Sequence, residues 1–127
     1  MADRFDMEDI IYNAIASKVS IPVYKGRSAD GMRDDHVTIR VLTAIDMNII
    51  NRGNVNVNIF LKRNSNGSEN RQAIKMITRQ IKDAIRGLKA PHGMYWQSRI
   101  VWSESLDEAK EGFDCMNIRL EINTEID

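Results

Sequence analysis

The sequence contains few of the residues from which covalent cross-links and catalytic centres are built. Its 127 residues include one cysteine, two prolines and two histidines. The single cysteine, Cys115, cannot form a disulfide within the chain and excludes a zinc site made of several cysteines. Because Cys115 falls in an alternating strand pattern, we expect a small, buried or half-buried thiol that packs as a hydrophobic residue.

Excess charge and long apolar runs are lacking as well. Eighteen basic and eighteen acidic residues give a formal net charge of zero, with 43% hydrophobic and 28% charged residues. Nucleic-acid binding through bulk electrostatics normally needs a basic excess, so no specific nucleic acid is predicted. No run approaches the ~20 apolar residues that span a bilayer, and no signal-peptide pattern is present. We expect one soluble domain over residues 1–127, located in the cytoplasm, with no membrane partner.

What the chain does contain is an alternating strand followed by a long amphipathic helix. Apolar side chains recur at every second position of residues 54–63, which predicts a half-buried strand. A polar turn follows, with Ser68 placed to cap a helix over residues 69–88. That helix has one apolar stripe and one charged face. We expect the charged face to be solvated, with contact to phosphate or an acidic partner as the alternative; it carries Arg71, Lys75, Arg79, Lys82, Asp83 and Arg86.

The segments before this pair predict a helix and two more strands. Residues 3–19 place apolar side chains on one helical face. Pro22 ends that helix because it lacks an amide donor, and a short strand at 23–24 follows. A second strand covers residues 36–46, and the pair at 52–53, Arg-Gly, predicts a turn into the next strand. Neighbouring strands joined by a short connection should pair antiparallel.

Two more strands complete the pattern, over residues 94–103 and 112–126, with an acidic connection between them. The resulting order is α-β-β-β-α-β-β. The simplest packing of such an order is an α+β fold, with a mainly antiparallel sheet of four to five strands and two helices on one face.

Residues that carry chemistry are sparse and separated. His36 and His92 have no second histidine or carboxylate at ligand spacing, so we expect each to be exposed. A hydrolytic pair would need Cys115 beside one of them in space. Three aspartates in the loop 26–35 do not match a calcium-binding spacing, and no glycine-rich phosphate loop is present. We predict no catalytic residue, no metal and no cofactor.

Two features favour a structural protein that assembles with partners. Asn54, Asn56 and Asn58 give one strand a flat, uncharged face that is suited to hydrogen-bonded contact. Polar loops at 26–35 and 104–111 are long for a small domain, and such loops often have a function. The alternative, ordinary loops and an ordinary polar sheet face, stays open.

The order and length of these elements also resemble a known family. A first amphipathic helix leads into IPVYKG, a polar loop, and the strand pair HVTIRVLTAID and GNVNVNIFLKR; the long helix SENRQAIKMITRQIKDAIRGL and two strands follow. This pattern is similar to the tail-completion and tail-terminator proteins of long-tailed bacteriophages and prophages, and to related head–tail joining proteins. The asparagine-rich strand is a departure that the resemblance does not explain.

The resemblance implies a protein without catalysis that forms a ring, commonly a hexamer, and meets other tail or connector proteins. It also implies a place in the virion. The subunit contacts would come from strand edges and loops, here the three asparagines together with Arg27, Asp30, Arg33, Asp34, Asp35, Asp107, Glu108 and Lys110. A small peptide- or RNA-binding module that uses the mixed face of the sheet is the alternative. It requires Trp96, Trp102 and Phe60 to form an exposed aromatic platform.

Overall fold

The described residues form two helices and five strands in the predicted order. The computed structural model describes residues 4–27, 31–47, 50–89, 95–106 and 112–125. This is the predicted α+β fold, with α1 (Arg4–Ala16), β1 (Val23–Lys25), β2 (His36–Met47), β3 (Ile50–Lys62), α2 (Arg71–Arg86), β4 (Trp96–Leu106) and β5 (Phe113–Glu125).

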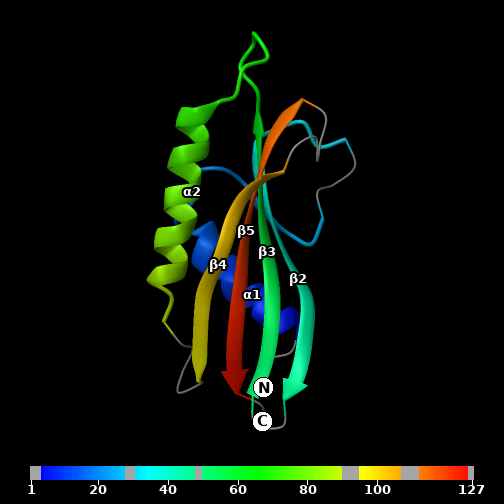
Figure 1. The fold of residues 1–127 in the computed structure, drawn as a ribbon, viewed down its shortest axis with the longest axis vertical. Coiled ribbons are helices and arrows are strands. Elements are labelled where there is room, and N and C mark those ends of the chain that lie inside the picture. Colours follow the sequence, from blue (N-terminus) through cyan, green and yellow to red (C-terminus); the bar gives the residue numbers. More distant parts are fainter. Residues whose placement is uncertain (1–3, 28–30, 48–49, 90–94, 107–111, 126–127) are drawn as a thin grey trace.

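The strands form one sheet in the order β1-β2-β3-β5-β4, as Figure 1 shows. β1 pairs with β2 in parallel, and the other neighbours are antiparallel, including the predicted pair of β2 and β3. β5 is the last strand in the chain, yet it lies between β3 and β4. The centre of the sheet is therefore a pairing between residues about sixty positions apart, for example Asn58 with Asn117.

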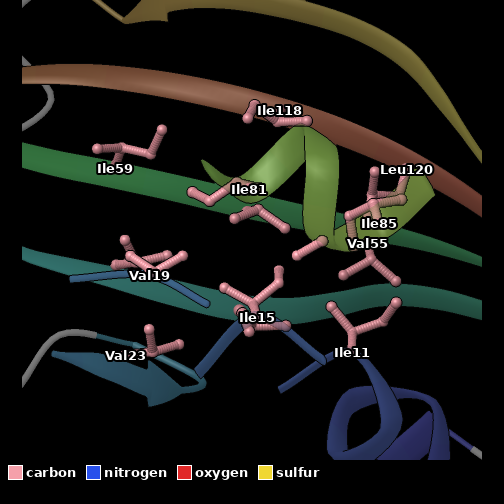
Figure 2. Close-up of a cluster of buried hydrophobic side chains, with 14 of the residues drawn as sticks. Ile11, Ile15, Val19, Val23, Val55, Ile59, Ile81, Ile85, Ile118 and Leu120 are labelled. Atoms are coloured by element: carbon pink, nitrogen blue, oxygen red, sulfur yellow. The ribbon is translucent and has the colours of Figure 1, made fainter. Parts of the chain in front are cut away.

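Both helices cover the same face of this sheet, because their apolar stripes enter one common core. In Figure 2, Ile11 and Ile15 of α1 and Ile81 and Ile85 of α2 lie against the strands. Alternate strand residues complete the core, as the two-residue period predicts. Among the described residues, the apolar strand side chains with no exposed surface are Val37, Ile39, Val41, Val55, Val57, Ile59, Ile118, Leu120 and Ile122.

α1 ends earlier than predicted. It ends at Ala16, although Val19 beyond it still packs into the core. Phe5 lies within the segment 3–19, whose apolar side chains were predicted to share one face, but it is 64% exposed. Lys25 of β1 reaches back to α1, where its Nζ lies 2.7 Å from an Asp9 carboxylate oxygen. Within the described residues, no helix is both long and apolar enough to cross a membrane.

The N-cap of α2 is Asn70, so the prediction of Ser68 was wrong. The Oδ1 of Asn70 accepts a hydrogen bond from the Ala73 amide, and the Asn70 amide donates to Asp114 of β5 at 3.1 Å. Asp114 therefore fixes where the helix begins, since it binds the capping residue itself. Ser68 is instead part of the preceding turn, where its hydroxyl donates to Asn66 at 2.6 Å.

Arg52 and Gly53 do not turn the chain, which corrects a second prediction. Both lie within β3, where Gly53 is buried and pairs with Ala44 on one side and Ile122 on the other. The Arg52 side chain donates from Nε to Asn123 on β5 at 3.0 Å. Pairing on both edges of β3 extends the strand past the point at which the local sequence predicts a turn.

Both strands that flank the central pair carry a bulge at the same level of the sheet. In β2 the register shifts between Val41 and Thr43, and in β4 it shifts between Ile100 and Trp102. The last regular partners before each shift are Val55 and Leu120, which pair with each other. A bulge increases local twist and changes which face the following side chains occupy. The sheet is consequently bent along one transverse row.

Candidate functional site

The first polar loop is anchored to the sheet at its end. The backbone amide of Lys62 donates to Asp35 at 2.8 Å, and its Nζ lies 3.3 Å from an Asp34 carboxylate oxygen. Of the predicted contact residues in this loop, Arg27, Arg33 and Asp34 are exposed and Asp35 is half-buried. Asp30 lies outside the described residues. Segment 31–35 thus presents charged side chains from a backbone that β3 holds in place.

His36 lies beneath this loop and is fully buried, so the expectation of an exposed histidine was wrong. Its ring stacks on Phe60 with centroids 4.7 Å apart and meets Phe113 and Tyr24 edge-on at 6.1 and 6.0 Å. The Nδ1 atom is 2.7 Å from the carbonyl oxygen of Asp34. Because a carbonyl only accepts, Nδ1 carries the proton. Aromatic neighbours from three strands bury the ring, although the two residues before it, Asp34 and Asp35, are acidic.

Cys115 is buried, as predicted, but it does not adjoin His36. Phe60 pairs with His36 on one side and with Cys115 on the other. Phe60 therefore lies between the two residues, whose backbones are two strand spacings apart, about 9–10 Å. His92 lies outside the described residues. Among the residues that the structure describes, no group of three or more histidine, cysteine, aspartate or glutamate side chains is placed to hold a metal ion.

The asparagine row of β3 is engaged with β5. Asn58 accepts a hydrogen bond from Asn117 at 2.8 Å, and Asn56 accepts one from the Arg119 guanidinium. Asn54 lies opposite Glu121 in the register. These amides lie on the face without helices and are half-buried. They form a ladder of polar side chains across the two central strands.

Trp102 extends this ladder to the edge of the sheet. Its indole Nε1 donates to Asn117 at 3.1 Å, and the Arg119 guanidinium lies 4.8 Å from the ring centroid. Trp102 is 44% exposed, whereas Trp96 packs against the core on the helix side. The bulge after Ile100 puts the two tryptophans on opposite faces. Phe60 is half-buried against His36, so the three aromatic residues form no common platform.

The second polar loop can be placed only at its start. Glu104, which the sequence assigned to the loop, belongs to β4 and pairs with Asn117. Asp107, Glu108 and Lys110 lie outside the described residues.

An open groove beside α2 was not predicted from the sequence. It encloses about 570 Å³, and Ile74 of α2 and Met116 of β5 form its apolar part. On the helix side of β4, large residues give way to Ser103 and Ser105, and the Lys82 Nζ donates to Ser103 at 3.1 Å. Most of its lining comes from the charged face of α2, so that face is the sequence signal that could have indicated this groove.

A scan against protein-family models finds no match for this chain, and a search of curated proteins finds none either. Three surfaces of the described residues offer chemistry for binding a partner. These are segment 31–35, the polar ladder of β3 and β5, and the groove between α2 and the sheet.

Proposed function

We propose that this chain is a non-enzymatic structural subunit that assembles with copies of itself. The best-fitting assembly is a ring at the head–tail junction of a phage or prophage, like those of tail-completion and tail-terminator proteins. Six subunits is the first ring size to test. The element order supports this proposal, since it matches the order that carries the resemblance.

The observation that carries the proposal is the anchored loop. Segment 31–35 is held by the two aspartate contacts to Lys62 and by the hydrogen bond from His36 to the Asp34 carbonyl. An interface made by an ordered loop loses less conformational entropy than one made by a free loop. Exposed side chains of both signs, such as Arg33 and Asp34, suit contact with a complementary surface on the next subunit.

The test is mass in solution by light scattering over a concentration series, at low and high salt. We expect one closed oligomer whose population falls in high salt, because exposed charges are screened. Arg33→Glu should raise the dissociation constant about tenfold or more, which is ~1.4 kcal/mol. Lys18→Glu, an exposed charge reversal after α1, serves as the matched control and should change little. A monomer under every condition would count against a self-assembling ring.

The alternative, a peptide- or RNA-binding module acting through stacked aromatic residues, has weaker support. It requires several aromatic rings on the uncovered face, and of the three candidates only Trp102 is exposed there. That ring is already engaged by Arg119. A stacking surface typically offers each bound base a free aromatic face.

A further inference from the structure

β4 is an edge strand with an unpaired outer side. It is the last strand in the sheet order, and the described part of the chain supplies no strand beyond it. Residues 101–105 are all exposed, and β4 contains no proline. Backbone N–H and C=O groups on the outer side of such a strand can pair with an added strand.

The helix beside this edge carries a basic stripe. Figure 1 shows α2 running alongside β4. Five basic residues recur along α2 at intervals of three or four positions, so they share one side of the helix. They all line the groove, which contains only two acidic residues, Glu69 and Asp83. The stripe consists of Arg71, Lys75, Arg79, Lys82 and Arg86.

We propose that the groove binds an extended acidic segment of a partner protein, which adds to β4 as a further strand. Side chains of an added strand alternate between the two faces of the sheet. Those level with Ser103 and Ser105 would point toward α2, because these serines lie on its side of β4. Acidic side chains at every second position would then meet the basic stripe. Lys82 of the stripe already reaches β4, where its Nζ donates to Ser103 at 3.1 Å.

Charge supports an acidic occupant. The whole chain has no net charge, yet five of the six charged residues within α2 are basic. Only Arg71 among the stripe has an ion-pair partner in the described chain, Glu69 at 3.7 Å. A nucleic acid would also bring negative charge, but it cannot use the backbone groups of a strand edge as a peptide does. A peptide can use both the edge and the stripe.

The test measures binding of a fluorescent peptide of about eight residues that alternates Thr and Glu, followed by anisotropy. Arg71→Glu with Lys75→Glu should weaken binding about tenfold or more. Both residues are exposed at the start of α2, where negative charge favours the helix, so the variant should fold. Lys18→Glu is the matched control, since Lys18 is exposed after α1 and is not among the residues that line the groove.

Two further probes separate strand addition from simple charge attraction. N-methylation of alternate peptide amides should abolish binding for one of the two alternate sets and spare it for the other, because only one set faces β4. A peptide of the same composition with its glutamates in blocks should bind less tightly. The proposal is overturned if the alternating peptide does not bind, if both methylated peptides bind equally, or if the charge reversals change nothing. Binding of an oligothymidine but not of the peptide would also overturn the proposal. So would a double variant that loses self-association while it still binds the peptide normally.

Discussion

Replacing His36 tests the account of how the first loop is held. In His36→Phe the ring can still stack on Phe60, but the hydrogen bond from Nδ1 to the Asp34 carbonyl is lost. An average intramolecular hydrogen bond contributes about 0.5–1.5 kcal/mol. Asp34 is exposed, so water can reach its carbonyl and keep the loss near the middle of that range. We expect a destabilisation of about 1 kcal/mol.

His36→Ala removes the ring as well and should cost much more. The side chain has no exposed surface and contacts aromatic rings from β1, β3 and β5. Aromatic-to-alanine changes in such places cost about 3–5 kcal/mol, because a cavity remains. For a chain of this size, 1 kcal/mol corresponds to roughly 4 °C in melting temperature. The two variants should therefore differ by about 10 °C.

The assay is urea unfolding followed by both circular dichroism and tryptophan fluorescence, whose agreement tests two-state behaviour. The reasoning is refuted if the alanine variant loses less than about 1 kcal/mol, or if the two variants are equally stable. In the first case the imidazole ring of His36 would not be part of the core. In the second, stacking on Phe60 would contribute nothing beyond the hydrogen bond. Light scattering on the phenylalanine variant would then show whether loosening segment 31–35 also weakens self-association.

Three further outcomes follow from the contacts described. Asn117→Ala and Trp102→Phe should each destabilise the fold by about 1 kcal/mol. Because the two side chains share a hydrogen bond, a double-mutant cycle should show a coupling energy of at least ~0.5 kcal/mol. Strictly additive effects of the two substitutions would contradict the ladder. Ile81→Ala, at the fully buried centre of α2, should cost about 2–5 kcal/mol in urea unfolding, and a loss under 1 kcal/mol would place Ile81 outside the core. The hydrogen bond to Asp9 raises the pKa of Lys25 above its ordinary 10.5. The contact therefore stabilises the fold fully below pH 10.5, and this stabilisation is lost as the pH rises through the higher pKa of the folded state. Asp9→Asn should flatten this alkaline dependence of the melting temperature, and an unchanged curve would rule out the contact.

Much of the fold could be predicted because its signals are local. The alternation of Val55, Val57 and Ile59 identifies β3 and its buried face without reference to other segments. The apolar stripe of α2 is equally visible, and residues such as Ile77 are buried as it predicts. These two periodicities, with the order of elements, suffice for the α+β fold and for both helices on one face.

The errors lie where distant strands determine the outcome. His36 is buried by Phe60 and Phe113, which are 24 and 77 positions away in the sequence. Gly53 continues a strand because β2 and β5 pair with it on both sides. Trp96 and Trp102 differ by an even number of positions and would share a face in a regular strand, but a bulge separates them. The local sequence predicted the polar loop of the candidate site but not the residues that hold this loop in place.

The interior position of β5 has a consequence for synthesis of the protein on the ribosome. Until β5 emerges, β3 has a partner on one edge only, and β4 has none. A nascent chain that has completed α2 and β4 therefore exposes the alternating apolar face of β3 beside an open edge, a combination prone to aggregation. Folding must wait for a contact between segments about sixty residues apart, as between Asn58 and Asn117. Such non-local closure is slow, so expression at low temperature or with chaperones that hold nascent chains should raise the yield of folded protein.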